Sequence, residues 1–238
     1  AVMMAEKLKN VPIVTGSDRF QTGRFALENY EIDTLILDDG FQHLALRRDL
    51  DILLCDHQRP LGNNHLFPAG ELREPASETR RADMVCFTRF LGGPIKFSQK
   101  YLGSIPQIKA HFRLDSLINM ESGEVCDVEI LKNQPVLAFC GIANPEGFRQ
   151  ILQDTQVQLK VFKTFPDHYE YSLNDIKQLE SEALAGGGKF VLLSEKDAVK
   201  LKGMKFSLPF YKVVIDLEIL EGREIFNKQI TSTGLGVN

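Results

Sequence analysis

Short apolar runs alternate with amphipathic helical patterns along most of the chain. The runs with the length and bounding turns of strands are 11–14, 32–37, 50–55 and 84–88, and then 135–140, 159–162, 189–194 and 210–215. Nearly continuous apolar strands separated by helices are typical of parallel strands that are buried on both faces. The pattern therefore predicts an α/β fold with a mostly parallel sheet.

Helix start and stop signals fall between these runs. The predicted helices begin after a polar cap or end at glycine, and they cover 19–29, 145–153, 173–185 and the tail from Glu218. Asn144 stands where a helix N-cap belongs, followed by Pro145 at the first helical position. Ser172 and Asp175 have the spacing of a capping box.

The opening segment, residues 1–10, has a helical pattern without a start signal. Ser, Thr, Asp or Asn is expected just before such a run, and none is present. We expect this segment to be the last turns of a helix, and the natural protein to be longer than 238 residues.

A change of pattern near the middle divides the chain. The stretch 108–128 alternates apolar and polar residues around a turn at 121–124, which predicts a hairpin. We interpret it as a hinge ribbon. The expected organisation is a core domain over 1–107, a ribbon over 108–134 and a smaller α/β domain over 135–238.

Composition narrows the class of protein. Hydrophobic residues make up 43% and charged residues 25%, which is ordinary for a soluble globular protein. The net charge of −4 argues against a dedicated nucleic-acid binder. The cysteines are far apart and form no CxxC pair, so we expect reduced thiols in a cytosolic protein, at Cys55, Cys86, Cys126 and Cys140.

The first candidate for chemistry is Asp38-Asp39-Gly40, directly after the run 32–37. A carboxylate at the end of a rigid strand suits a Walker B element, which binds the Mg²⁺ of a nucleotide. Gln42 and His43 follow the turn that Gly40 permits, and we expect them to face the same region. A turn that merely exposes two aspartates explains the same residues equally well.

The long segment from Asp56 to Pro75 is rich in Pro, Gly, Asn and His, and a loop of this length is usually functional or disordered. Arg73 offers a guanidinium fork that matches phosphate oxygens. Glu74 would hold waters of the metal or orient the arginine. A surface Arg–Glu pair at a helix start is the competing interpretation.

Two further candidates lie in the second half of the chain. His168 follows Asp167 in a predicted loop, and a histidine beside a carboxylate is a candidate general base or a group that orients one. Such a pair is more often a surface feature. Lys196 is available for a substrate phosphate, although its acidic neighbours also fit a solvated helix start.

Taken together, these motifs resemble the tetraacyldisaccharide 4'-kinase family, the lipid A 4'-kinases of Gram-negative bacteria. The segments that carry the resemblance occur in the family's order over about residues 1–215, and they are 37–43, 47–49, 62–63, 66–75, 141–145, 165–169 and 194–198. The segments 38–43 and 68–74 are its most specific part.

The resemblance implies a reaction and a fold. The reaction is transfer of the γ-phosphoryl group of ATP to the 4'-hydroxyl of a tetraacyldisaccharide 1-phosphate, in lipid A biosynthesis. It would take place at the cytoplasmic face of the bacterial inner membrane, with peripheral membrane contact and no nucleic-acid partner. The implied fold is a P-loop-kinase-like sheet with a smaller α/β domain on a two-stranded hinge.

The resemblance also implies roles for individual residues. Asp38 and Asp39 would hold Mg²⁺ at the ATP phosphates, with Gln42 also at the nucleotide. Asp39 and His168 are the expected catalytic residues, His168 by supporting the base that deprotonates the 4'-hydroxyl. The residues expected at the lipid substrate are His43, Arg73, Glu74 and Lys196.

The chain departs from the family in one respect. It contains no GxxxxGK[ST] loop, which the family carries upstream of a Gly-Asp-Glu segment. Because the amides of that loop cradle the phosphates, we expect the chain by itself to be inactive. We expect it to be the C-terminal two-thirds of an enzyme of roughly 340 residues.

Two other functions stay open on the sequence. A metal-dependent phosphohydrolase would use Asp38, Asp39, Asp56 and His168, and it would release phosphate without ATP. A nucleotide- or lipid-binding module with a decayed site would show no activity even if the upstream segment were restored.

Overall fold

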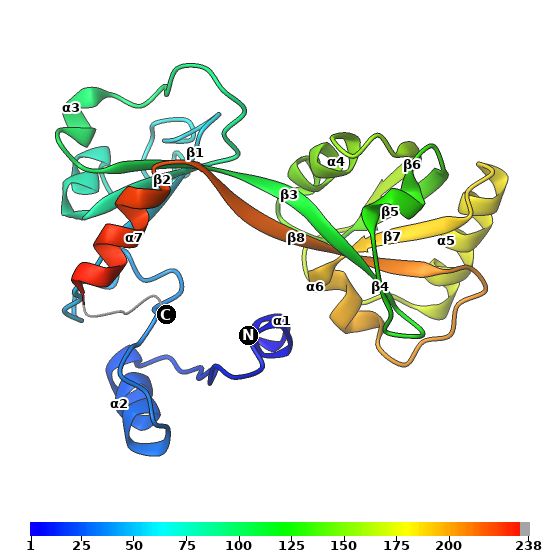
Figure 1. The fold of residues 1–238 in the computed structure, drawn as a ribbon, viewed down its shortest axis with the longest axis horizontal. Coiled ribbons are helices and arrows are strands. Elements are labelled where there is room, and N and C mark those ends of the chain that lie inside the picture. The colour runs from blue at the N-terminus through cyan, green and yellow to red at the C-terminus, as the bar shows by residue number, and fades with distance from the viewer. Residues whose placement is uncertain (234–238) are drawn as a thin grey trace. The chain divides into compact units, whose positions relative to one another are not determined.

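The computed structural model describes residues 1–233, and the chain forms two compact units (Figure 1). Unit 1 consists of residues 1–9 and 113–216, and unit 2 of residues 10–112 and the chain from Leu217 onward. Two long strands, β3 (Gln107–Asn119) and β8 (Phe210–Glu221), each begin in one unit and end in the other. Each unit therefore contains segments that are far apart in the sequence.

The remaining strands are β1 (Ile52–Asp56), β2 (Met84–Thr88), β4 (Val125–Cys126), β5 (Pro135–Cys140), β6 (Gln158–Thr164) and β7 (Phe190–Ser194). The α-helices are α1 (Val2–Lys7), α2 (Arg19–Asn29), α3 (Gln99–Leu102), α4 (Pro145–Gln153), α5 (Leu173–Ala185), α6 (Glu195–Ala198) and α7 (Arg223–Ser232). The 3-10 helices are η1 (Ala76–Arg81), η2 (Val128–Leu131) and η3 (Val199–Leu201). Within residues 1–233, no helix is both long and apolar enough to cross a membrane.

The sheet is mostly parallel, in the order β1-β2-β3-β8-β7-β5-β6. Parallel pairs join β1 to β2, β2 to β3, β5 to β6, β5 to β7 and β7 to β8, whereas β4 pairs antiparallel with the end of β3. The predicted α/β class with a mostly parallel sheet is confirmed.

Helices cover both faces of the sheet in unit 1. Successive strand residues point to opposite faces, so Leu137 and Phe139 of β5 share a face, where they pack with buried residues of α5. Phe162 of β6 is paired with Ala138, on the other face, and its ring lies 6.3 Å from that of Phe148 in α4. The apolar strands of this unit are therefore buried from two sides.

Unit 2 has two smaller cores, one on each side of β2. Val85 and Phe87 pack with Phe97 and Leu102 on one face. Met84 and Cys86 pack on the other, in a cluster against which Ile219 of β8 and Phe226 of α7 lie. Successive side chains of β2 point to opposite faces, so alternate residues of this one strand belong to different cores.

Two predicted strands are wrong. Residues 11–14 and 32–37 are not strands in the structure, and Ile36 is 91% exposed. A strand exists only where a neighbour completes its hydrogen-bond ladder, and no described strand pairs with either segment. Asp38 and Asp39 consequently follow an irregular segment instead of the strand that their Walker B interpretation assumed.

The predicted hairpin is present, but its role differs from the expected hinge ribbon. Leu117 pairs with Cys126, and the turn between β3 and β4 lies inside unit 1. One arm of this hairpin, β3, does pass between the units, but the second strand that does so is β8 instead of β4. Hairpin pairing is local in the sequence, whereas β3 and β8 are neighbours only in the tertiary structure.

The helix caps agree with the sequence. The Asn144 side chain accepts the amide of Gly147, with Pro145 in the first turn of α4. Ser172 and Asp175 form a complete capping box at the start of α5. The tail differs in one respect, because β8 continues to Glu221 and α7 begins only at Arg223.

Candidate functional site

The turn at Asp39 meets the segment at Arg73 in unit 2. Asp39 has a left-handed backbone with φ of 50°, a conformation that aspartate adopts more readily than most residues. A Cβ at the next position, Gly40, would lie 2.5 Å from the Leu37 side chain, so the turn requires glycine there. Arg73 Nη1 donates to Asp39 Oδ2 over 2.9 Å, and both side chains are well exposed. Asp38 lies exposed in the same turn.

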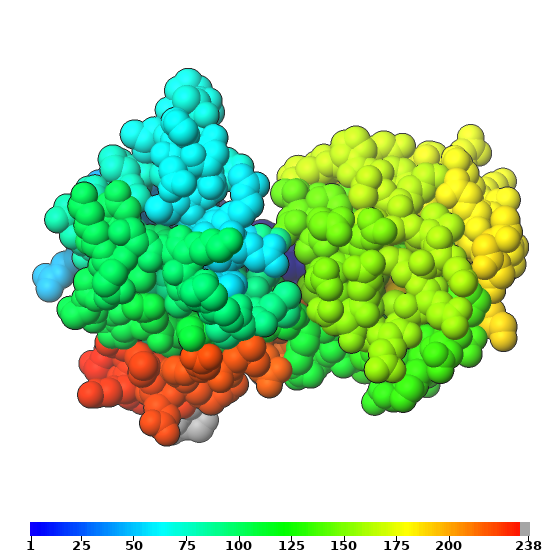
Figure 2. All heavy atoms as spheres, turned by 90° about the horizontal axis from the view of Figure 1, so that it is seen from above, coloured from blue at the N-terminus to red at the C-terminus, as the bar shows by residue number. Residues whose placement is uncertain are grey.

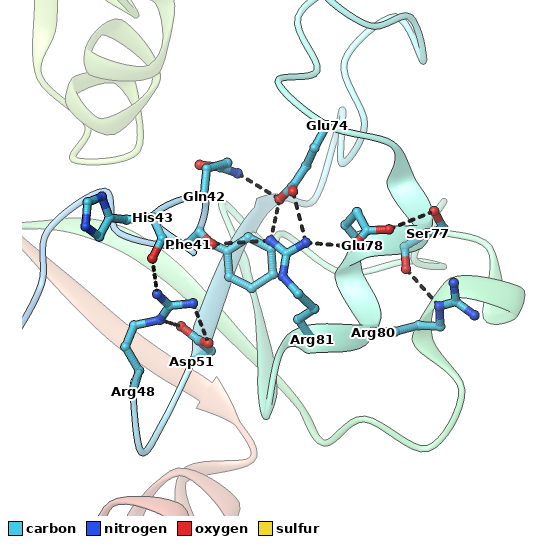
Figure 3. Close-up of polar contacts among 10 residues, drawn as sticks. All are labelled: Phe41, Gln42, His43, Arg48, Asp51, Glu74, Ser77, Glu78, Arg80 and Arg81. Carbon is cyan, nitrogen blue, oxygen red and sulfur yellow. Dashed lines mark hydrogen bonds and ion pairs between the residues drawn. The ribbon is translucent and has the colours of Figure 1, made fainter. Parts of the chain in front are cut away.

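The neighbouring Glu74 is held by two partners (Figure 3). Arg81 donates to both of its oxygens, at 2.8 and 3.0 Å, and Gln42 Nε2 donates to Oε1 at 3.2 Å. Arg81 also pairs with Glu78 at 2.7 Å, donates to the Phe41 carbonyl and lies 4.7 Å from the Phe41 ring centre. The hydrogen bond that Arg81 donates to Glu74 is the main cause that raises the pKa of Arg81 above its ordinary value.

A second arginine fixes the chain after the candidate turn. Arg48 makes a two-pronged contact with Asp51, at 2.6 and 3.0 Å, and donates to the His43 carbonyl at 2.5 Å (Figure 3). It also donates to the Leu46 carbonyl at 2.9 Å. The His43 amide in turn donates to the Gly40 carbonyl. Segment 40–46 is therefore held through its backbone, and half-buried His43 is positioned by that backbone.

The structure thus gathers six of the predicted residues in one part of unit 2, including the exposed Asp38. Asp39 and Arg73 form one exposed pair, Gln42 and Glu74 form a second contact, and His43 lies on the same turn. Asp56, the third carboxylate of the phosphohydrolase hypothesis, ends β1, where it pairs with Arg89 and accepts the Gln58 amide.

The donor set at this turn fits a magnesium ion that is shared with a nucleotide. Mg²⁺ is usually bound by one or two carboxylates, while waters and substrate phosphates supply its other ligands. Asp38 and Asp39 supply two exposed carboxylates in this turn, and that of Asp39 contacts the Arg73 guanidinium. Among the described residues, no group of three or more His, Cys, Asp or Glu side chains forms a complete metal cage.

The other predicted residues lie in unit 1. Lys196 Nζ donates to Asp167 Oδ1 at 2.6 Å, and His168 Nε2 lies 3.8 Å from Asp167 Oδ2. The hydrogen bond from Lys196 is the main cause that lowers the pKa of Asp167. His168 is 80% exposed and has a left-handed backbone with φ of 62°. Lys196 and His168 thus meet at one carboxylate, a link that spacing in the sequence did not reveal.

A buried carboxylate lies behind this group. Asp197 is fully buried, and it accepts hydrogen bonds from the Gly141 amide (2.9 Å), the Tyr171 hydroxyl (2.9 Å) and the Ser194 hydroxyl (2.6 Å). Lys200 Nζ, from η3, lies 3.3 Å from Asp197 Oδ1. The other three partners come from the ends of β5 and β7 and from the chain after β6. The network therefore ties together the strand ends that carry Asp167 and Lys196.

Three of these residues received no role from the sequence, although Arg48 and Asp197 stand in segments that carry the family resemblance. Arg48, Arg81 and Asp197 position others through contacts with backbone groups or with residues from other elements. The i, i+3 spacing of Glu78 and Arg81 was a weak signal for an ion pair. The pairing of Arg81 with Glu74 had no such signal in the sequence. It depends on the turn at Pro75, where η1 begins, which brings the two side chains together.

Known proteins match most of the chain. The family model described as tetraacyldisaccharide-1-P 4'-kinase matches residues 1–233. The tetraacyldisaccharide 4'-kinase of Pelobacter propionicus is 39% identical over 203 residues, covering 85% of this chain and 56% of the relative. That of Geobacter sulfurreducens is 38% identical over 221 residues, covering 92% and 61%. The chain thus spans less than two thirds of the length of these curated relatives.

A solved structure is also similar. The crystal structure of "apo" form LpxK from Aquifex aeolicus in complex with ATP matches with a TM-score of 0.75 and 33% sequence identity. The match covers 97% of this chain and 67% of that one.

Proposed function

Because the chain belongs to the tetraacyldisaccharide-1-P 4'-kinase family, we propose that its protein transfers the γ-phosphoryl group of ATP to the 4'-hydroxyl of a tetraacyldisaccharide 1-phosphate. The names of the relatives and the complex of the Aquifex aeolicus protein with ATP support this reaction. The observation that carries the proposal is the contact between Asp39 and Arg73. It joins a carboxylate suited to a metal and a guanidinium suited to a phosphate.

In this proposal Asp38 and Asp39 hold Mg²⁺ together with the nucleotide phosphates. Bound there, the ion would neutralise charge that develops on the transferred phosphoryl group. Gln42 lies at the nucleotide, oriented by its hydrogen bond to Glu74. Arg73 donates to Asp39, and its guanidinium fork would bind phosphate oxygens of the substrate.

We keep His43 and Glu74 as proposed substrate residues, but their contacts suit them to different roles. Both oxygens of Glu74 already accept hydrogen bonds from Arg81, so its contribution is to position Gln42 and the backbone of 73–75. His43 has its backbone fixed by Arg48 and Gly40, which leaves its ring to meet a sugar or phosphate group.

The proposed roles in unit 1 concern the acceptor. His168 supports removal of the proton from the 4'-hydroxyl, and its exposed ring is accessible for this. Asp167 lies beside that ring and would stabilise a protonated imidazole. Lys196 would release Asp167, its present partner, and bind a substrate phosphate instead.

The acceptor named for the relatives is a lipid with several acyl chains. We therefore place the reaction at the cytoplasmic face of the bacterial inner membrane, with peripheral contact. ATP is available on that side, and a lipid acceptor remains in the bilayer because its acyl chains are costly to expose to water.

The test measures transfer of phosphate from labelled ATP to tetraacyldisaccharide 1-phosphate by the full-length protein that contains this chain. We expect Asp39→Asn and Arg73→Ala to lower kcat/KM by on the order of 10²-fold or more, as loss of charge-stabilising groups does elsewhere. Arg59→Ala is the matched control, because Arg59 also forms an exposed pair in this loop, with Glu71 at 3.2 Å.

If Asp39→Asn and Arg73→Ala keep the activity of the Arg59→Ala control, the proposed site is refuted. Phosphate release without ATP would favour the phosphohydrolase instead. The 238-residue chain, assayed in parallel, tests the separate expectation that it is inactive by itself.

A further inference from the structure

The long loop after β1 presents an apolar tip, which we define as Leu66-Phe67-Pro68-Ala69. We propose that this apolar tip inserts among the acyl chains of the lipid layer that holds the acceptor. The inference rests on the proposed function, since the acceptor there is a lipid. It assigns the membrane contact to one element of unit 2.

The apolar side chains of this tip are well exposed. Residues 63–69 are all exposed, and Phe67 is 80% exposed with Leu66 at 45%. Figure 2 shows the cyan part of the chain projecting from the rest of unit 2. Two adjacent large apolar side chains in water are unfavourable, and their burial in acyl chains would remove that penalty.

The loop is held in shape from within. Asn63 Oδ1 accepts the amides of His65 (3.2 Å) and Glu71 (3.4 Å), and Asn63 Nδ2 donates to the Ala69 carbonyl (3.3 Å). A Cβ at Gly70 would lie 2.2 Å from both Asn63 Oδ1 and the His65 carbonyl, so the closure requires glycine.

Backbone hydrogen bonds complete the closure across the tip itself. The Phe67 amide donates to the Leu72 carbonyl at 2.8 Å, and the Gly70 amide donates to the Leu66 carbonyl at 3.0 Å. A preorganised loop loses little conformational freedom on binding, which favours insertion of a small apolar surface.

The two ends of the loop have different chemistry. The tip is apolar, whereas the base carries the guanidinium group of Arg73 and leads into the candidate phosphate site. Leu66 bridges to Leu72, which places the tip directly next to the segment that enters Arg73. This order matches an amphiphile whose acyl chains meet the tip while its phosphorylated sugar meets the base.

The size of the tip favours lipid over a protein partner. Stable protein interfaces bury at least about 1,200 Å² in total, more than two adjacent side chains on a loop provide. An acyl layer needs no complementary partner surface, so a single exposed aromatic residue contributes there on its own.

The chain contains no tryptophan, so Phe67→Trp creates a single fluorescent reporter at the tip. With vesicles of phosphatidylethanolamine and phosphatidylglycerol, we expect its emission to shift to shorter wavelength and to be quenched by lipids brominated in their acyl chains. Leu184→Trp, at a 59% exposed position of α5 in unit 1, is the control and should show neither effect.

Phe67→Ser gives an independent measure without a reporter. We expect its partition into the same vesicles to fall by on the order of tenfold or more, while Leu184→Ser leaves partition unchanged. An unshifted, unquenched Phe67→Trp, an equal response at Leu184→Trp or unchanged partition of Phe67→Ser would overturn the proposal. These measurements contain neither ATP nor acceptor, so failure of insertion is distinguishable from failure of the proposed kinase activity.

Discussion

Replacing Arg81 by methionine tests whether the contacts of Glu74 organise the candidate site. The substitution keeps an unbranched apolar stem but removes every hydrogen bond of the guanidinium, two of them to Glu74 and one to Glu78. It leaves two carboxylates without their shared cation. It also removes the hydrogen bond to the Phe41 carbonyl. Glu74, which accepts from the adjoining Gln42, loses the contacts that hold it in place.

The magnitude follows from the burial of the partners. Exposed ion pairs contribute about 0.2–1 kcal/mol, whereas breaking a fully buried pair costs about 3–5 kcal/mol. The side chains of Arg81 and Glu74 are 26% and 21% exposed, which places them between these limits. We therefore expect Arg81→Met to lower the free energy of unfolding by about 2 kcal/mol.

Urea unfolding followed by circular dichroism measures this loss, with Arg80→Met as the matched control. Arg80 is the preceding residue on η1, and among the described residues its Nε donates to the Ser77 carbonyl alone, at 3.0 Å (Figure 3). Its replacement should change stability by no more than about 0.5 kcal/mol.

A double-mutant cycle with Glu74→Gln separates the pair from general effects of the mutations. We expect a coupling energy of about 1–2 kcal/mol between Arg81 and Glu74. In the full-length protein, kcat/KM should also fall by about tenfold or more, because Gln42 loses its orientation. Equal stability of the two arginine variants, or a coupling energy near zero, would refute this reasoning.

Two further predictions concern unit 1. Asp197→Asn should lower the free energy of unfolding by about 3 kcal/mol, because it removes a buried charge that faces Lys200 and three other donors. Tyr171→Phe removes a single hydrogen bond and should lower it by only about 1 kcal/mol. Equal losses for the two variants in urea unfolding would contradict the network. Ser172→Ala should cost about 1 kcal/mol near neutral pH. The Ser172 hydrogen bond is the main cause that lowers the pKa of Asp175, so this carboxylate stabilises the fold above its ordinary pKa of about 4. That part is lost as pH falls through the depressed value, so the difference between wild type and Ser172→Ala should shrink in acid, and a constant difference in thermal unfolding would contradict it.

Local chemistry made several elements of the fold predictable. The buried runs 84–88 and 135–140 are strands with those bounds, because apolar residues on both faces suit a parallel strand. Asn144 and Ser172 cap the helices expected of them, because a cap bonds to amides only a few residues away. Such features depend on residues that are close in the sequence, so they can be identified without the tertiary structure.

Features that depend on distant partners were predicted less well. The run 32–37 has the composition of a strand, yet composition cannot supply the second ladder that a strand requires. The helical tail was expected from Glu218, although β8 continues to Glu221. The hinge was assigned to a local hairpin, whereas the second strand between the units is β8, far along the chain.

The candidate site divides in the same way. Residue types and motifs identified the groups with suitable chemistry, namely the acidic turn at Asp39, the guanidinium of Arg73 and the imidazole of His168. The folded structure was needed to show that Asp39 contacts Arg73, that Glu74 pairs with Arg81 and that Asp197 is buried among four donors. The physical reason is that the identity of a side chain sets what it can bind, whereas its partner is chosen by the path of the folded backbone.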